Sequence, residues 1–589
     1  MANEEEDIKN LGARADAGLA QPAIKSATAP PIGDDGGGTS ASDRCTEIMV
    51  GKDATVDGSV ITGYSCDGPT LPRIHVVPGE TYRPGTMMPI YYNPSFYPGP
   101  VMSYEKYLEY MATEPLLLAE IPQVEETYKC VEIEAQYNTR HGGGTNQYGL
   151  TIANSGLHRP ELVNENALMF SIQDYTEDSL MALALRRAKT AREAIHVIGS
   201  LAEKYGYGDE GGSIMISDGN EVWALEIFGP GADWTKDCGK PGAVWCAQRI
   251  PNDEVGVCSN RSRIGEVDLN DSDYFMASPN VYSLALEKGW WDGTKPFIFY
   301  EAYGLTLPAQ QKSAVWREWR VLSLVAPSLC LPPPPETGDQ RYPFSVKPDE
   351  FLSAKDIMAL LRDTLQGSPY DVTEDPAFYV DGQKSPMACP WGPRDLHKLL
   401  GVSPKRSVSF AMSPFSWVTQ VRADFPDPIK SCLWFGCGPA DTTCYVPIYS
   451  GVTQLPNGWY DLEINQISRA NPWWAFTQVN NLSLIKYQDT IVDIKAVRDP
   501  AEDNFFVQQP AIEDVVKDLY NNRSEVAAQE LAEKLVTNYS GACMDAVSDG
   551  YWKLVDYLLF KYFTRASDGG LFTLPAIGCP TVPTNVGED

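Results

Sequence analysis

The sequence lacks the long apolar runs of membrane proteins and the histidine patterns of zinc enzymes. No stretch of about 18 apolar residues occurs, so no transmembrane helix is expected. Only 5 histidines are present, and neither an HExxH motif nor a CxxC pair accompanies them, which argues against a zinc site. The acidic start, MANEEE, is not followed by an apolar segment and is therefore not a standard signal peptide.

Basic residues are also scarce. The chain has 47 lysines and arginines against 78 aspartates and glutamates, and its net charge of −31 argues against nucleic acid and anionic membranes as partners. Its 13 cysteines are odd in number and scattered, and a disulfide framework is not implied in a chain of this size. The cysteines leave the compartment open, whereas the missing signal peptide and transmembrane segment favour the cytoplasm.

One stretch, CTEIMVGKDATVDGSVITGYSCD, predicts a β-hairpin that begins on Cys45 and ends on Asp67. Apolar residues alternate over 48–50, and a second β-forming run follows at 59–62. The Asp57-Gly58 pair between them is a typical hairpin turn. The first strand therefore opens on a cysteine, and the second ends near an aspartate.

The segment in front of this hairpin has a different composition. Residues 33–44 are rich in Gly, Ser and Asp, so this segment cannot bury enough apolar surface to fold and should be open to cleavage. Cutting the Arg44–Cys45 bond would expose an α-amine with a pKa of roughly 7.7–8.0 beside a thiol with a pKa of about 8.5. Nucleophile and general base would then share one residue. The alternative is that Cys45 is simply a buried small side chain at a strand start.

The remaining pattern predicts antiparallel sheets covered by helices, an α+β fold. Helices are expected at 178–189 and, after a capping box, from 190 to about 201, followed by a hairpin of 213–216 with 222–227. A capped helix is expected from 353 to about 366, and three more near 511–520, 524–535 and 552–563. We divide the chain into a disordered leader (1–44), a catalytic core (45–330), its continuation with helical and loop-rich insertions (331–510) and a C-terminal helical segment (511–589).

Further motifs follow the hairpin in a fixed order. They are NQYGL at 146–150, NEVW at 220–223, SNRSRI at 259–264, GSPYDVT at 367–373, LWFG at 433–436 and VPIYSGVT at 446–453. Together with the Cys45 hairpin they resemble the N-terminal-nucleophile dipeptidases, the dipeptidase A family to which the secernins are related. The resemblance extends from residue 45 to about 565.

This resemblance implies a four-layer αββα sandwich, in which two antiparallel sheets lie between helical layers. It implies hydrolysis of dipeptides or short peptides through an acyl-enzyme, with Cys45 as nucleophile and its α-amine as base. No metal or organic cofactor is implied, and a homo-oligomer is compatible with the family. An amide hydrolase acting on N-acyl amino acids and a catalytically silent, secernin-like binding or regulatory protein are the alternatives.

The resemblance also implies roles for other residues of the site. Asp67 would orient the α-amine, and Asn260 would donate a hydrogen bond to the oxyanion. Arg317 matches a late arginine of the superfamily, with Arg320 as its rival for that position and a candidate substrate binder. Two asparagines are further candidates for binding substrate, Asn146 and Asn154.

The chain departs from the family pattern just before Asp67. Many relatives have Arg-Asn-Asp there, whereas this chain reads Tyr64-Ser65-Cys66 before its aspartate, so an arginine is missing. Cys66 is interpreted as a packing residue that could also form a disulfide with a nearby thiol. Whether cleavage is autocatalytic is open, because Arg44 would equally suit a trypsin-like protease. A permanent leader would leave no α-amine and would exclude the mechanism.

Overall fold

The computed structural model describes residues 45–68, 71–92, 116–136, 140–164, 179–305, 308–392, 394–460, 467–563 and 573–581. Contacts divide the chain into two units, Met1–Ser40 and Ala41–Asp589, and the fold described here is that of the second. The expected leader at 1–44 and its cleavage site at Arg44 lie outside the described residues.

The first sheet carries Cys45 and has seven strands in the order β14-β12-β1-β2-β17-β18-β19. All neighbouring strands are antiparallel. The predicted hairpin is confirmed as its β1–β2 pair, and the region 331–510 contributes four of the seven strands. The strands are β1 (Thr46–Val50), β2 (Val60–Cys66), β12 (Val255–Cys258), β14 (Ser345–Val346), β17 (Phe415–Val421), β18 (Ser431–Cys437) and β19 (Val446–Tyr449).

The second sheet has eight antiparallel strands in the order β13-β11-β10-β9-β8-β7-β6-β3. The predicted hairpin of 213–216 with 222–227 is confirmed as β9–β10. Its strands are β3 (Leu71–Val77), β6 (Cys130–Gln136), β7 (Arg140–Asn146), β8 (Thr151–Gly156), β9 (Gly212–Ser217), β10 (Val222–Phe228), β11 (Val244–Ile250) and β13 (Phe275–Ala277). Two short hairpins stand apart from it, β4 (Met87–Tyr92) with β5 (Leu116–Pro122) and β15 (Tyr379–Val380) with β16 (Gln383–Lys384).

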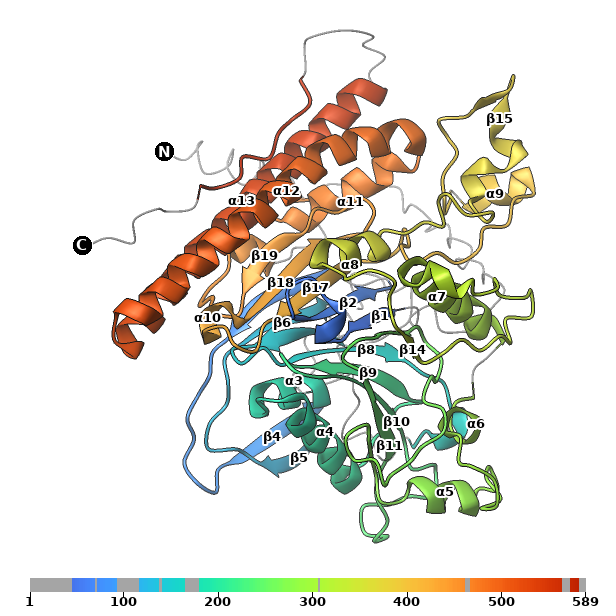
Figure 1. The fold of residues 1–589 in the computed structure, drawn as a ribbon, viewed down its shortest axis with the longest axis vertical. Coiled ribbons are helices and arrows are strands. Elements are labelled where there is room, and N and C mark those ends of the chain that lie inside the picture. The colour runs from blue at the N-terminus through green and yellow to red at the C-terminus, as the bar shows by residue number, and fades with distance from the viewer. Residues whose placement is uncertain are drawn as a thin grey trace, which may run out of the picture. The chain divides into compact units, whose positions relative to one another are not determined.

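The two sheets face each other, because β1 contacts β8 and β10, and β18 contacts β7. Among the described helices, α3, α4 and α5 pack on the second sheet, and α7, α8, α10, α11, α12 and α13 contact the first (Figure 1). This is the αββα sandwich that the resemblance implies, and the prediction is confirmed. The helices are α3 (Leu180–Arg187), α4 (Ala191–Tyr205), α5 (Val281–Glu287), α6 (Phe299–Ala302), α7 (Pro308–Val325), α8 (Ala354–Leu361), α9 (Arg394–Leu400), α10 (Asp427–Lys430), α11 (Pro472–Ser483), α12 (Tyr487–Asn522) and α13 (Glu525–Phe563).

Side-chain caps explain where the shorter helices begin. The Thr190 hydroxyl accepts a hydrogen bond from the Glu193 N–H at the start of α4. The Glu193 carboxylate accepts from the N–H of Lys189, one residue before the position that a capping box requires. At α8 the box is complete, because Ser353 and Asp356 each accept from the other's backbone N–H.

The C-terminal helices are longer than expected. Two continuous helices, α12 and α13, replace the three short ones, and the division between 510 and 511 falls inside α12. Pro500 and Pro510 both lie within α12, where proline removes a backbone donor and would ordinarily end a helix. Packing of the buried face of α12 against α13 and β19 maintains the helix across both prolines. In the described part of the chain, no helix combines the length and apolarity needed to cross a bilayer.

Candidate active site

Cys45 immediately precedes β1 and lies in the space between the two sheets. Its side chain shares a face of the strand with Glu47, because side chains two residues apart point the same way. Ser213 of β9 in the second sheet donates a hydrogen bond to Glu47 Oε2 at 3.3 Å, so this face is turned inward. Cys45 is accordingly only 6% exposed.

Two side chains of β2 donate hydrogen bonds to the Cys45 sulfur. The Tyr64 hydroxyl lies 3.3 Å from Sγ, and the Cys66 thiol forms the second bond. The bond from Cys66 lowers the pKa of Cys45, and the bonds from Tyr64 and from the Asp67 N–H act in the same direction. Burial and the Asp67 charge oppose them, but the net pKa is lowered. Donation to Cys45, together with burial, raises the pKa of Cys66, so Cys45 is the thiol of the pair that loses its proton more readily.

Asp67, at the end of β2, is held by residues from a distant segment. Arg406 forms an ion pair with its carboxylate, and the Ser413 hydroxyl donates a hydrogen bond to the other oxygen. Both residues precede β17, the strand that pairs with β2. Arg406 therefore brings a guanidinium to Asp67, in a chain that lacks the arginine of the family pattern just before this aspartate.

Arg317 of α7 connects Cys45 with Asn260. Its Nη1 donates to the Cys45 carbonyl oxygen at 2.6 Å and to Thr46 Oγ1 at 3.1 Å. Its Nη2 donates to the Ser259 carbonyl oxygen at 2.9 Å and to Asn260 Oδ1 at 3.0 Å. A planar guanidinium suits such a bridge, because its donors form a rigid fork.

Arg320 lies elsewhere, although it is only three residues further along the same helix. Its guanidinium forms hydrogen bonds of 2.8–3.0 Å with both oxygens of Asp363 and donates to the Gln366 carbonyl at 2.9 Å. Of the two rival arginines, Arg317 is therefore the one that the fold brings to Cys45.

Asn260 follows β12 and has a left-handed backbone, with a φ of 67°. Asparagine tolerates this conformation better than most residues, and such backbones cluster at functional sites. Its Nδ2 donates to the Gly156 carbonyl oxygen at 3.1 Å. An amide nitrogen carries two hydrogens, so the second is available to a ligand. Arg317 on Oδ1 and Gly156 on Nδ2 together fix the plane of the amide.

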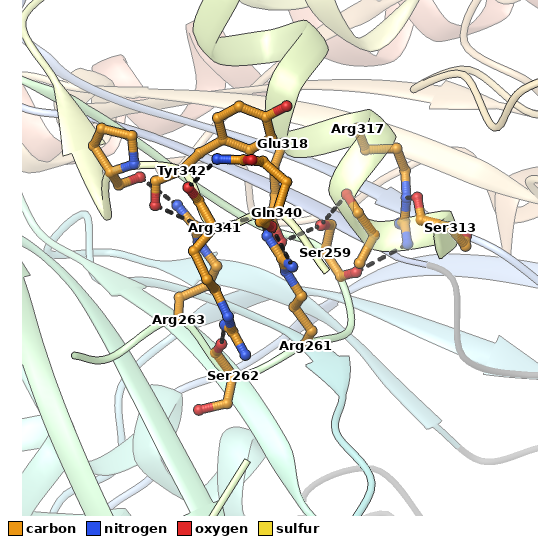
Figure 2. Close-up of polar contacts among 12 residues, drawn as sticks. Ser259, Arg261, Ser262, Arg263, Ser313, Arg317, Glu318, Gln340, Arg341 and Tyr342 are labelled. Carbon is orange, nitrogen blue, oxygen red and sulfur yellow. Dashed lines mark hydrogen bonds and ion pairs between the residues drawn. The ribbon is translucent and has the colours of Figure 1, made fainter. Parts of the chain in front are cut away.

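A buried ionic cluster holds α7 against the segment that carries Asn260. Figure 2 shows Glu318, the neighbour of Arg317, bound by the guanidinium groups of Arg261 and Arg263. The Ser259 hydroxyl also donates to this carboxylate at 3.2 Å. Burial raises the pKa of Glu318, but the charges of the two arginines outweigh it, and the net pKa is lowered. The ionised Glu318 thus fixes the spacing between Arg317 and its acceptors.

Glu47 is a second buried carboxyl group close to Cys45. Burial raises its pKa well above the ordinary value, and the negative charge of Cys45 adds to the effect. Glu47 therefore keeps its proton to a higher pH than an ordinary glutamate, which disfavours a second negative charge beside Cys45. Its position two residues after Cys45 in an alternating strand was the sequence signal that could have identified it.

The structure does not bring the two candidate asparagines to Cys45. Asn146 Nδ2 donates to the Leu185 and Ala188 carbonyl oxygens at 2.8 Å, and its Oδ1 accepts from the N–H groups of Tyr148 and Leu150. These bonds join the β7–β8 turn to the end of α3.

Asn154 lies opposite Ile214 on β9, a residue of the core cluster beneath α3 and α4. Because side chains alternate along a strand, Asn154 points toward the helical layer, and its neighbour Ser155 points toward Glu47. Its Nδ2 is buried and has no hydrogen-bond partner among the described residues.

The chain is similar to known proteins over most of its length. A model of peptidase family C69 matches residues 44–499. A probable dipeptidase of Latilactobacillus sakei is 24% identical, over 73% of this chain and 79% of its own length. Dipeptidase A of Lactobacillus helveticus is 23% identical, over 71% and 77%. Penicillin V acylase from Agrobacterium tumefaciens, a solved structure, is 13% identical over 69% of this chain and 86% of its own, with a TM-score of 0.28.

Proposed function

Because the chain belongs to peptidase family C69, we propose that it hydrolyses dipeptides or short peptides, with Cys45 as the nucleophile. Relatives named as dipeptidases match about three quarters of the chain, which supports this substrate class. The lowered pKa of Cys45 supports its role, since the thiolate is the nucleophilic form of cysteine.

The first chemical step requires a free α-amine on Cys45, released by cleavage after Arg44. The Cys45 thiolate attacks the carbonyl carbon of the peptide bond, and the carbonyl oxygen becomes an oxyanion. The second hydrogen of Asn260 Nδ2 stabilises this oxyanion, and the protonated α-amine passes its proton to the leaving amine. A thioester on Cys45 remains. Water then attacks this thioester with the α-amine as base, which releases the acid and regenerates the thiolate.

Asp67 and Arg317 position the reacting groups. The charge of the Asp67 carboxylate acts on the Cys45 thiol, which supports a position close enough to orient the α-amine. Arg406 and Ser413 hold that carboxylate. Arg317 fixes the Cys45 carbonyl and thereby the direction in which the amine and thiol extend from the residue.

The observation that carries the proposal is the bridge made by Arg317. One guanidinium holds both the Cys45 carbonyl and the Asn260 amide, at 2.6 and 3.0 Å, so nucleophile and oxyanion donor belong to one hydrogen-bonded unit. Catalysis by positioning depends on such a fixed relation between the attacking atom and the group that stabilises the transition state.

N-terminal sequencing of the purified protein, together with a hydrolysis assay, tests the proposal. We expect a mature chain that begins at Cys45 and cleaves dipeptides, and a Cys45→Ala variant that does not. Cys238→Ser, at an exposed cysteine between β10 and β11, is the matched control and should remain active. Full activity with residues 1–44 still attached would refute the α-amine mechanism.

If the purified chain is intact and inert, an engineered protease site after Arg44 removes the leader. Activity gained by this cleavage supports the proposal, and continued inactivity on both dipeptides and N-acyl amino acids contradicts it. Hydrolysis of N-acyl amino acids alone would retain the nucleophile and correct the substrate class.

A further inference from the structure

Cys66 lies directly across the hairpin from Cys45. The antiparallel register pairs Thr46 with Ser65 and Glu47 with Tyr64. Extending this register by one residue places Cys45 opposite Cys66, with both side chains on the face turned toward the second sheet. The hydrogen bond between the two thiols agrees with this placement.

The spacing of such a pair suits a disulfide. Directly opposed residues of antiparallel strands have Cα atoms roughly 4.5–5.5 Å apart, and a disulfide requires roughly 4.4–6.8 Å. Cys45 precedes β1 and Cys66 ends β2, so the pair sits at the end of the β1–β2 ladder. Cys66 is also paired with Phe415 of β17, and Arg317 holds the Cys45 carbonyl, so the backbone on both sides of the pair is fixed. Because the Cα spacing of opposed residues already suits a disulfide, closure requires little more than a rotation of the two side chains.

The two thiols also differ in the way that a reactive cysteine and its resolving partner differ. The pKa of Cys45 is lowered and that of Cys66 is raised, so one is the nucleophile and the other retains its proton. A redox-sensitive cysteine is typically a thiolate next to a second thiol. Cys45 is only 6% exposed, but the proposed function already requires a dipeptide to reach its sulfur, and a peroxide is smaller.

We propose that Cys45 and Cys66 form a dithiol site that peroxides oxidise to a disulfide. The Cys45 thiolate attacks one peroxide oxygen, the O–O bond breaks, and a sulfenic acid forms as hydroxide or an alkoxide leaves. The Cys66 sulfur then attacks the sulfenic sulfur, its thiol proton leaves with the hydroxyl group as water, and the S–S bond forms. The two thiols together lose two electrons, and the peroxide gains them. A dithiol such as dithiothreitol reverses the reaction by thiol–disulfide exchange.

The consequence for catalysis rests on the proposed function. A disulfide occupies the sulfur that attacks the substrate, so the oxidised protein is inactive. It also prevents a second peroxide from converting the sulfenic acid to the irreversible sulfinic acid. Cys66 would thus protect the nucleophile as well as lower its pKa.

Peroxide treatment followed by alkylation of the remaining thiols and peptide mass spectrometry tests the proposal. In the wild-type protein we expect a disulfide-linked pair of peptides that contain Cys45 and Cys66, loss of dipeptide hydrolysis, and recovery in dithiothreitol. In Cys66→Ser the same treatment should give sulfinic acid at Cys45, with no recovery. Cys238 is the control, because it is exposed and its pKa is also lowered; Cys238→Ser should behave as wild type.

Absence of the Cys45–Cys66 link in folded, peroxide-treated wild-type protein overturns the proposal. Equal recovery of wild type and Cys66→Ser in dithiothreitol overturns it as well. The link is detected by mass and not by activity, so its presence in a protein that cleaves no dipeptide would support the dithiol site and contradict the proposed function. Hydrolysis of dipeptides by a protein that never forms the link would support the proposed function and contradict the dithiol site.

Discussion

Replacing Arg317 with lysine tests whether the bridge between Cys45 and Asn260 serves catalysis. The guanidinium donates four hydrogen bonds from two terminal nitrogens, two on the Cys45 side and two on the Asn260 side. A lysine ammonium is a single point of charge and reaches one of these pairs only. Arg317→Lys therefore leaves two buried acceptors without their donor.

The expected magnitude follows from those two bonds. A hydrogen bond to a charged group contributes about 1.5–3 kcal/mol, so the free energy of unfolding should fall by about 3–6 kcal/mol. If the lost pair includes Asn260, the oxyanion donor is no longer held, and loss of such a donor typically lowers kcat by about 10²–10³. The KM for a dipeptide should change much less, because Arg317 contacts the reacting residue and not the substrate.

Urea titration gives the free energy of unfolding of each mature variant. The kcat and KM are then measured well below the unfolding midpoint, so that only folded protein contributes. Arg320→Lys is the matched control, since it makes the same substitution one turn away, at an ion pair with Asp363. It should lower the unfolding free energy by about 1.5–3 kcal/mol, the contribution of one such bond, and leave kcat unchanged. Equal losses of kcat in the two variants, or a rise in KM alone for Arg317→Lys, would refute the bridging role.

Three further predictions concern the surroundings of Cys45. Asn260→Ala should lower kcat by about 10²–10³ with an intact fold, checked by kinetics and circular dichroism; unchanged kcat would exclude it as the oxyanion donor. Arg406→Ala should lower the free energy of unfolding by about 3–5 kcal/mol, because it leaves a buried Asp67 without its partner; urea titration beside Arg406→Lys measures this. Glu47 binds its proton more tightly in the folded state than in the unfolded one, so stability should fall as the pH rises above about 4.3 toward its raised folded pKa. Glu47→Gln, which resembles the protonated acid, should remove that slope in urea titrations between pH 5 and 8; a slope equal to that of wild type would contradict the assignment.

Local patterns in the sequence were sufficient to predict the hairpin that carries Cys45, because alternation and an Asp-Gly turn act over a few residues. They failed at α12, where the pattern predicted a helix only near 511–520, whereas tertiary packing maintains one from Tyr487 to Asn522 across two prolines. The difference is physical. The hairpin depends on interactions between neighbours in the chain, whereas the length of α12 depends on its packing against other elements.

The site followed the same division. The motifs predicted Cys45, Asp67, Asn260 and Arg317, which the fold brings close together. The choice between Arg317 and Arg320 required the orientation of α7, which the buried Glu318 cluster determines. Asn146 and Asn154 illustrate the opposite case, since a motif position alone does not tell which way a side chain points.

The departure from the family pattern before Asp67 now has a physical explanation. An arginine near that aspartate supplies positive charge, but the charge need not come from the same strand. Here Arg406 supplies the charge from the segment that precedes β17. Its ion pair with Asp67 therefore connects that segment to the end of β2, the strand with which β17 pairs. The arginine of the family pattern would stand at position 65, and Ser65 alternates with Tyr64 and Cys66, so its side chain points to the face away from the Cys45 side chain. Tyr64 and Cys66 lie on the same face as Cys45 and donate to its sulfur. The positive charge beside Asp67 and the two neutral donors to Cys45 therefore come from separate positions, and neither role displaces the other.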